Sequence, residues 1–239
     1  MKHPKIFLAT PTSQVKDYAW MRWYTNVESM VDHYAGDVQL YVSDNSPTMD
    51  YFHYLQKFDL QVGKVHPRGR RSTEVICESF NQIRDSFLKS DAELLCIVES
   101  DVIPPHDTLH RLAAWQLPIV SAVYFTGNGD DRFPMILVGD EINEVYTTRL
   151  LGPELLAYLD GGLKTAFASG VGCVLITRDI VAKVPFRHIP GVGMHPDALF
   201  YQDLNQIART QHHVDTSILC KHYNQDWNQH IHLTKNFSK

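Results

Sequence analysis

The sequence predicts an α/β protein: a single domain with a mostly parallel central sheet flanked by helices. Short apolar runs bounded by turn-forming residues alternate with segments in which apolar residues recur every three or four positions, the patterns of buried strands and amphipathic helices. The 239 residues are enough for one large domain with a substantial core. We see no internal repeat, low-complexity tract or obvious linker, and a domain boundary would cut the predicted sheet.

The first half of the chain predicts the regular alternation of strands and helices. Residues 72–89 give the clearest helix, because apolar side chains recur at helical spacing and Ser72 or Thr73 can cap its start. The apolar run over residues 94–98 is short and ends at polar residues, which is typical of a strand buried in a sheet. The predicted strands cover residues 6–10, 38–43, 60–65 and 94–98, and the predicted helices cover residues 17–34 and 72–89.

The second half is less regular. Residues 126–134 are rich in Gly, Asn and Asp and are expected to form a loop. A helix is expected over residues 200–210, with Asp203 near its start. The tail over residues 224–239 is polar. The strands predicted here cover residues 118–124, 171–177 and 214–220.

Composition excludes several classes of protein. The formal net charge of -5 gives no basic surface for general nucleic-acid binding. The 4 cysteines are scattered, so we expect buried free thiols in a reducing compartment rather than a disulfide framework or a zinc site. The first apolar run is too short for a signal peptide, and no segment approaches the length of a membrane span. A cytoplasmic protein is therefore expected.

The most informative stretch is Glu99-Ser100-Asp101, which follows an apolar strand and precedes Pro104-Pro105. Ligand sites of open α/β sheets lie at this end of the strands. A charge there is costly unless a cation meets it, and a divalent metal that holds a diphosphate would do so. The alternative is that the two acids only cap the strand end and start a turn.

Further short motifs follow one another in a fixed order. They are Thr10-Pro11-Thr12, Ser43-Asp44-Asn45-Ser46, Ser79-Phe80-Asn81, Glu99-Ser100-Asp101, Ser169-Gly170-Val171-Gly172, Gln202-Asp203-Leu204 and His222. This order resembles the nucleotide-sugar glycosyltransferases of the GT-A fold, most closely glycosyltransferase family 2, over residues 5–223. The chain departs from the family pattern twice: Glu99 stands where the metal-binding triplet usually begins with Asp, and Gln202 replaces an acid before Asp203.

The resemblance implies roles for residues around the donor. Asp101 would bind Mn²⁺ or Mg²⁺ between the donor's phosphates, and His222 would complete the metal site. Glu99 would lie nearer the ribose, or would contact a ligand of the metal rather than the metal itself. The remaining donor-binding residues would be Thr10, Pro11 and Thr12 in the nucleoside pocket, Asp44 at the base, Arg71 at the diphosphate, and Asn81 and Ser100. Three of these residues have a structural alternative: Asp44 could form only a turn, Arg71 could lie on a solvated loop, and Asn81 could be a polar group on a helix face.

The resemblance also implies a reaction. Asp203 would be the general base that takes the proton of an acceptor hydroxyl as it attacks the sugar, with inversion at the anomeric carbon. The alternative for Asp203 is a first-turn acid that stabilises a helix start. Residues 1–117 would build the donor half and residues 118–223 the acceptor half.

The expected function is a metal-dependent glycosyltransferase that uses a nucleoside-diphosphate sugar, with a UDP-sugar as the expected donor. The acceptor stays open among a glycan, a lipid-linked sugar, a protein side chain and a modified nucleobase. One alternative is a non-catalytic nucleotide-sugar-binding or structural protein with a decayed site. Another is a sugar nucleotidyltransferase, although residues 10–18 contain no Gly and only one basic residue, Lys16.

Overall fold

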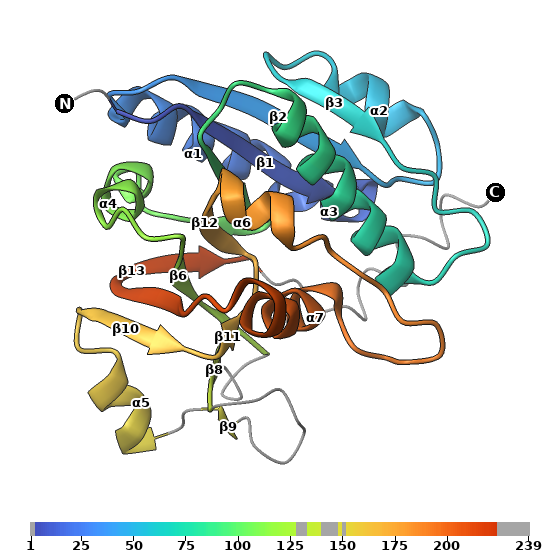
Figure 1. Ribbon diagram of the computed structural model, residues 1–239. Coiled ribbons are helices and arrows are strands. Elements are labelled where there is room, and N and C mark those ends of the chain that lie inside the picture. The colour runs from blue at the N-terminus through green and yellow to red at the C-terminus, as the bar shows by residue number, and fades with distance from the viewer. Residues whose placement is uncertain (1–2, 128–132, 140–147, 150–151, 224–239) are drawn as a thin grey trace.

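The computed structural model describes residues 3–127, 133–139, 148–149 and 152–223. A curled mixed sheet runs through the molecule with helices on both faces (Figure 1). Its main path has the strand order β10-β13-β6-β12-β4-β1-β2-β3. A small separate sheet has the order β11-β8-β9. The predicted single α/β domain with a central sheet is confirmed.

The first half of the chain forms the parallel part of the sheet. Its strands are β1 (Ile6–Thr12), β2 (Val38–Asp44), β3 (Gln61–Lys64) and β4 (Leu94–Val98), and they pair in parallel. Its helices are α1 (Asp17–His33), preceded by a 3₁₀ turn (Gln14–Lys16), α2 (Asp50–Leu55) and α3 (Ser72–Lys89). The predicted helix over residues 72–89 is confirmed, but Arg71 occupies the N-cap position, so neither Ser72 nor Thr73 does.

The second half extends the sheet with mixed pairing. Here β12 (Cys173–Thr177) is antiparallel to both β4 and β6 (Ile119–Thr126), whereas β13 (His212–His222) is parallel to β6. The shorter strands are β5 (Val102–Ile103), β7 (Phe133–Pro134), β8 (Ile136–Val138), β9 (Thr148–Arg149), β10 (Leu163–Ala166) and β11 (Ala168–Ser169). The helices are α4 (Thr108–Ala114), α5 (Gly152–Tyr158), α6 (Arg178–Lys183) and α7 (Pro196–Asp203), which continues into a π-helical turn (Leu204–Ala208).

Two sequence-based expectations in this half are corrected. The loop expected over residues 126–134 does not hold at its two ends, because Thr126 ends β6 and Phe133–Pro134 form β7 against it; residues 128–132 lie outside the described residues. The helix expected to start near residue 200 begins at Pro196, so Asp203 is its last residue and not an acid near its start. The tail over residues 224–239 lies outside the described residues.

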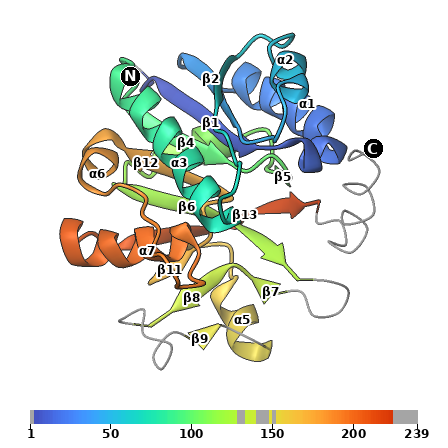
Figure 2. The same cartoon turned by 90° about the vertical axis from the view of Figure 1, so that its right-hand side faces the viewer.

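Alternating side chains of β1 explain the layers. Phe7 and Ala9 pack with the apolar face of α3, while Ile6 and Leu8 pack with Trp20 and other residues of α1. Figure 2 shows α3, α6 and α7 on one face of the sheet and α1 and α2 on the other. The cysteines Cys77, Cys96, Cys173 and Cys220 are buried and free. Within the described part of the chain, no helix is both long enough and apolar enough to span a membrane.

Candidate functional site

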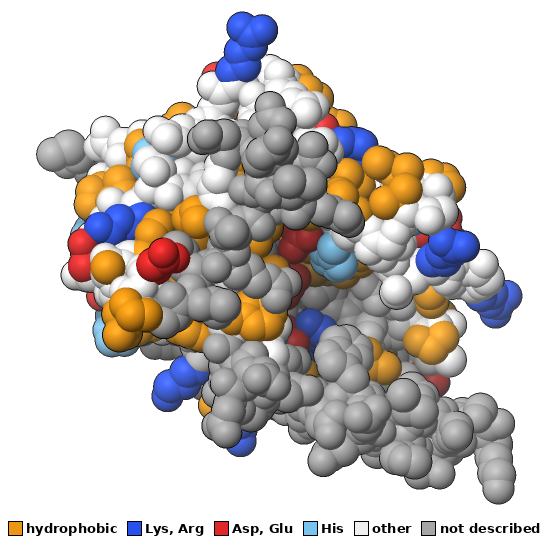
Figure 3. All heavy atoms as spheres, turned by 90° about the horizontal axis from the view of Figure 1, so that it is seen from below, with side chains coloured by type: hydrophobic (Ala, Val, Ile, Leu, Met, Phe, Trp, Pro, Cys, Tyr) orange, Lys and Arg blue, Asp and Glu red, His pale blue; other side chains and the backbone are white. Residues whose placement is uncertain are grey.

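A cavity of about 780 Å³ lies at the carboxyl ends of β1 and β4. The 3₁₀ turn after β1, the start of α3, the start of α7 and the end of β13 border it. Seen from below, acidic, histidine and cationic side chains surround a hollow near the centre of this face (Figure 3). The parallel strands direct their carboxyl ends to this edge, which is where open α/β sheets bind ligands.

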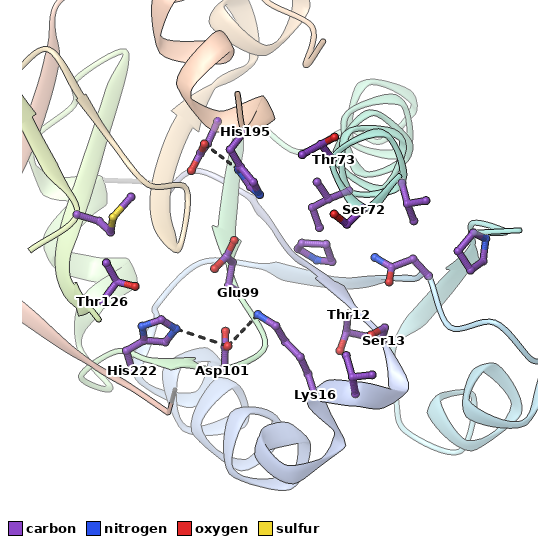
Figure 4. Close-up of a pocket in the computed structure, with 18 of the residues that line it drawn as sticks. Thr12, Ser13, Lys16, Ser72, Thr73, Glu99, Asp101, Thr126, His195 and His222 are labelled. Atoms are coloured by element: carbon purple, nitrogen blue, oxygen red, sulfur yellow. Dashed lines mark hydrogen bonds and ion pairs between the residues drawn. The ribbon is translucent and has the colours of Figure 1, made fainter. Parts of the chain in front are cut away.

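Asp101 is the most constrained charge in the cavity. Its Oδ2 lies 2.8 Å from Lys16 Nζ and 3.5 Å from His222 Nε2 (Figure 4). Burial raises the pKa of the Asp101 carboxyl, but His222 and Lys16 outweigh that effect and lower the pKa to about 2. Asp101 therefore carries its negative charge throughout the neutral range.

Backbone pairing brings His222 to Asp101, although the two residues are far apart in the sequence. In the short ladder between β5 and β13, His222 is the partner of Val102, and Tyr223 N donates to the Asp101 carbonyl at 2.8 Å. His222 Nδ1 lies 2.9 Å from the Phe125 carbonyl, which can only accept a hydrogen bond. Nδ1 therefore carries a proton, and Nε2 faces the Asp101 carboxylate. Burial lowers the pKa of the His222 ring, but the hydrogen bond and charge of Asp101 outweigh burial and raise it.

The side chains of Asp101 and His222 can supply two ligands of a divalent cation. Asp101 Oδ1 is buried and has no hydrogen-bond partner among the described residues, so this oxygen is available. His222 Nε2, which lies 3.5 Å from Oδ2 of the same carboxylate, would add a nitrogen ligand when it carries no proton. The described residues contain no group of three or more His, Cys, Asp or Glu side chains placed to hold a metal, so phosphate oxygens and water would have to complete the coordination.

Glu99 points into the cavity between Asp101 and His195 (Figure 4). Burial raises the pKa of its carboxyl, Lys16 opposes the rise, and Asp101 adds to it. Its backbone N–H donates to the Gly172 carbonyl at 2.9 Å, which ties the end of β4 to the start of β12. A second carboxylate therefore faces the same space as Asp101.

His195 and Asp197 line the opposite wall. His195 Nδ1 lies 2.8 Å from Asp197 Oδ1, which also accepts from the Ala198 backbone N–H at 2.7 Å. Pro196 occupies the first turn of α7, where its missing N–H costs nothing and its fixed φ suits a helix. The sequence reasoning missed both residues, although the triplet His195-Pro196-Asp197 carries a helix-start signal: a proline followed by an acid.

The structure brings about half of the sequence-predicted site residues to the cavity. Those that line it are Pro11, Thr12, Glu99, Asp101 and His222. The others are outside the described lining: Thr10, Asp44, Arg71, Asn81, Ser100 and Asp203. Their predicted roles stay predictions, and their contacts show what each residue does in the fold.

Two of these six support the cavity wall from behind. Ser100 Oγ accepts from Thr12 Oγ1 at 3.1 Å and so joins the ends of β4 and β1. Thr10 is buried, and its hydroxyl donates to the Pro11 carbonyl at 3.2 Å. Both residues hold the polypeptide that borders the cavity.

Asp44 and Arg71 lie beside residues that do line the cavity. Asp44 is fully buried; its Oδ1 accepts from the Ser46 N–H at 2.8 Å, and its Oδ2 lies 2.6 Å from Lys64 Nζ. Its neighbour Asn45 lines the cavity. Arg71 is exposed, whereas Arg70 lines the cavity and is paired with acids on α3.

Asn81 and Asp203 bind other parts of the chain. Asn81 donates to the Phe186 carbonyl at 2.8 Å and accepts from the Phe186 N–H at 3.1 Å. Asp203 is buried, and Arg187 contacts both of its oxygens, Nε with Oδ2 at 2.6 Å and one terminal nitrogen with Oδ1 at 3.0 Å. Gln202 accepts from the same guanidinium at 2.9 Å.

Lys16 is the main cation that sequence reasoning did not place in the site. It is the last residue of the 3₁₀ turn, directly before α1 and four residues after the predicted nucleoside-pocket motif, and it pairs with Asp101. Burial lowers the pKa of Lys16, but Asp101 and Glu99 outweigh burial and raise it, so the ammonium stays charged. The rest of the described lining is Ser13, Val15, Asn45, Pro67, Arg70, Ser72, Thr73, Val75, Ile76, Tyr124, Thr126 and Met135.

Comparisons with known proteins bear on the fold. No family model matches the chain, and no curated protein matches its sequence. Among solved structures, S. aureus TarS in complex with UDP-GlcNAc has a TM-score of 0.56 at 12% identity, covering 93% of this chain and 60% of that chain. GalNAc-T7 with UDP, GalNAc and Mn²⁺ has a TM-score of 0.60 at 11% identity, covering 92% of this chain and 44% of that chain.

A third structure is a CMP:2-keto-3-deoxy-manno-octonic acid synthetase with CTP, which has a TM-score of 0.50 at 13% identity and covers 88% of both chains. The chain thus spans 60% and 44% of the two glycosyltransferases. At these identities the likeness concerns the fold alone, and it confirms the GT-A-like fold predicted from the sequence.

Proposed function

We propose that the chain transfers a sugar from a nucleoside-diphosphate sugar to an acceptor hydroxyl, with inversion at the anomeric carbon. The observation that carries this proposal is the meeting of Asp101, Lys16 and His222 in one cavity at the carboxyl ends of β1 and β4. Such a mixture of one carboxylate and two nitrogen groups suits a diphosphate and its counter-ion. The structures of TarS with UDP-GlcNAc and of GalNAc-T7 with UDP support a UDP-sugar as the donor.

The chain's own residues account for donor binding. Lys16 presents a permanent positive charge to the cavity, and Ser72 and Thr73 place the N-terminus of the 18-residue helix α3 on its wall. Both features attract phosphate. Asp101 and His222 would hold Mn²⁺ or Mg²⁺, and GalNAc-T7 is solved with Mn²⁺. When bound, such an ion would neutralise charge on the departing nucleoside diphosphate.

Transfer also needs a base, because a sugar hydroxyl is a weak nucleophile until its proton is removed. The sequence points to Asp203 for this role, and that role stays a prediction. Arg187 occupies both Asp203 oxygens, so substrate binding would have to release at least one of them.

Calorimetric titration with UDP tests the donor site. With Mn²⁺ present, wild-type chain should bind UDP, and excess chelator should weaken that binding. Asp101→Asn should weaken UDP binding in Mn²⁺ by about 10- to 100-fold, because the cation loses a charged oxygen ligand. Asp91→Asn, a change to an exposed acid paired with Lys5, is the matched control and should have no effect. Full UDP affinity in Asp101→Asn, or unchanged affinity in chelator, would contradict metal-assisted donor binding.

A nucleotidyltransferase is the second candidate, because the synthetase with CTP matches this chain over 88% of both lengths. The two functions leave different products. A glycosyltransferase releases UDP from a UDP-sugar, whereas a nucleotidyltransferase releases pyrophosphate from a nucleoside triphosphate and a sugar. Assaying UDP and pyrophosphate release side by side, over a panel of UDP-sugars and of CTP or UTP with free sugars, decides between them. Donor binding with neither product would favour the non-catalytic alternative.

A further inference from the structure

His195 and Asp197 form a hydrogen-bonded pair on the cavity wall that faces Asp101; His195 is the exposed partner and Asp197 is the shielded one. The side chain of His195 is 49% exposed, whereas that of Asp197 is 13% exposed. Figure 4 shows the His195 ring entering the cavity on the side of Glu99. The pair therefore combines an accessible imidazole with a shielded carboxylate.

The hydrogen bond between them sets the tautomer of the ring. A carboxylate only accepts hydrogen bonds, so Nδ1 of His195 carries the proton that Asp197 Oδ1 receives at 2.8 Å. Nε2 of the neutral ring then has a free lone pair, and it has no hydrogen-bond partner among the residues that the structure describes. This is the orientation in which a carboxylate prepares histidine to accept a proton.

Asp197 is itself held in place. Its Oδ1 accepts from the Ala198 backbone N–H at 2.7 Å in the first turn of α7, and Pro196 restricts the backbone between the two partners. These contacts hold the Asp197 carboxylate in the orientation that accepts from His195.

The charges around the ring favour its protonated form. Burial lowers the pKa of His195, and the hydrogen bond and charge of Asp197 together with the charge of Glu99 outweigh burial and raise it, while Lys16 opposes the rise. An imidazolium that forms during reaction would thus be stabilised by two carboxylates. Because these carboxylates favour the protonated ring, they favour movement of a hydroxyl proton onto Nε2.

The other acids of the region are less suited to this task. Oδ2 of Asp101 is paired with Lys16 and His222, and Oδ1 is the proposed cation ligand. Both Asp203 oxygens accept from Arg187 outside the described lining of the cavity. A lone pair engaged by a cation is not available to a hydroxyl proton. Glu99 lies in the cavity and is the competing candidate that the experiment must separate.

Building on the proposed glycosyl transfer, we propose that His195, oriented by Asp197, is the general base of this site. The oxygen of the acceptor hydroxyl forms a bond to the anomeric carbon, and the hydroxyl proton moves to Nε2 of His195. The bond from the anomeric carbon to the diphosphate oxygen breaks, and its electron pair leaves with the nucleoside diphosphate. The imidazolium later returns its proton to solvent.

The test uses UDP-GlcNAc as the donor probe and water as the acceptor, with UDP release as the readout. His195→Gln should lower kcat by about 10²- to 10⁴-fold while UDP affinity changes less than about threefold, because the base acts on the acceptor and not on the diphosphate. Added imidazole should restore part of the activity of His195→Gly. His53→Gln, on the exposed side of α2, is the matched control and should keep wild-type kcat.

The pH profile separates a base from a merely structural residue. Wild-type kcat/KM should fall as pH drops through the raised pKa of His195. Asp197→Asn should move that acid limb to lower pH, because the ring loses the carboxylate that favours its proton. Asp179→Asn, an exposed first-turn acid of α6, should leave the limb in place.

Other outcomes show whether the role of His195 or the proposed glycosyl transfer is wrong. If UDP binds and His195→Gln retains wild-type kcat while Asp203→Asn or Glu99→Gln loses it, His195 is not the base and the glycosyl transfer stands. An unmoved acid limb in Asp197→Asn likewise overturns the pair. If wild-type chain binds neither UDP nor UDP-GlcNAc, the proposed function is wrong, and the role of His195 falls with it.

Discussion

The two carboxylate oxygens of Asp101 have different surroundings. Oδ2 contacts Lys16 and His222, whereas Oδ1 is buried without a partner among the described residues. A carboxylate so arranged can keep an ammonium on one oxygen and present the other to a cation. Lys16 and a divalent ion would then repel each other across a single side chain.

This geometry makes a prediction for Lys16→Met. Removing a positive charge 2.8 Å from Oδ2 should raise the affinity of the nucleotide-free chain for Mn²⁺ by about tenfold, because the ion no longer meets a competing cation. The same change should weaken UDP binding, since Lys16 faces the proposed phosphate position. Electron paramagnetic resonance of free Mn²⁺ measures the first effect and calorimetry the second.

Lys57→Met, an exposed lysine after α2, serves as the control for the lost charge and should leave both affinities unchanged. Equal Mn²⁺ affinity in wild type and in Lys16→Met would show that Lys16 does not compete for Asp101.

Residues at strand ends were predictable, and residues on loops were not. Glu99 and Asp101 follow a recognisable buried strand, and His222 ends another, so the edge of a parallel sheet gathers them. His195 comes from an irregular segment, and Lys16 from a 3₁₀ turn. Their positions depend on how those segments pack over the sheet, which no periodic pattern in the sequence encodes.

At the scale of elements, α7 shows how a helix boundary changes an interpretation. Starting the helix near residue 200 makes Asp203 a first-turn acid, whereas its observed start at Pro196 gives that place to Asp197. The two interpretations differ by about one turn of helix, which moves the first turn by about 6 Å along the axis and leaves Asp203 at the end of α7. The long amphipathic helix α3 was predicted to the residue because its apolar face is continuous.

Asn81 connects two elements that are distant in the sequence, α3 and the segment after α6. Its amide makes both a donated and an accepted hydrogen bond with the backbone of Phe186. Asn81→Ala should lower the free energy of unfolding by about 1–3 kcal/mol, because the Phe186 N–H and C=O lose their partner. Urea denaturation measures this loss.

Asn26→Ala on α1, where the side-chain amide donates to the Met30 sulfur at 3.4 Å, is the control and should cost less. The predicted donor-binding role of Asn81 is tested on the same protein by UDP titration. A large loss of UDP affinity with an unchanged free energy of unfolding would mean that Asn81 serves donor binding rather than the link between α3 and Phe186.

At the scale of the whole molecule, one sheet joins the two halves and thereby builds the site. β12 pairs with β4, and the end of β13 pairs with β5, so late strands insert beside early ones. The alternation of strands and helices predicts the parallel first half, because each βα unit is local in sequence. Antiparallel insertion of β12 between β4 and β6 is a long-range pairing, and local patterns do not determine it.

The interior of the second half contains a polar network that links these strands to α7. His212 Nε2 lies 2.9 Å from Ser121 Oγ, which accepts from Ser169 Oγ at 3.1 Å, and Ser169 Oγ lies 2.9 Å from the Tyr201 hydroxyl. His212 is fully buried, and its Nδ1 has no partner among the described residues. Burial, with a smaller effect of His213, lowers the pKa of His212 to about 3.

This buried histidine should make the stability of the whole molecule depend on pH. An unfolded histidine takes up a proton near pH 6.5, whereas folded His212 stays neutral down to about pH 3, so the unfolded state binds more protons between these values. Stability must then fall as pH drops, and the contribution of His212 between pH 7 and pH 5 is about 2 kcal/mol. Urea denaturation at the two pH values measures the loss.

His212→Gln should be less stable at pH 7 because its packing changes, yet it should lose about 2 kcal/mol less than wild type on acidification. His53→Gln, which alters an exposed histidine, should follow the wild-type dependence. Parallel losses in wild type and His212→Gln would mean that His212 accepts a proton in the folded chain, and that the interior beside α7 admits charge.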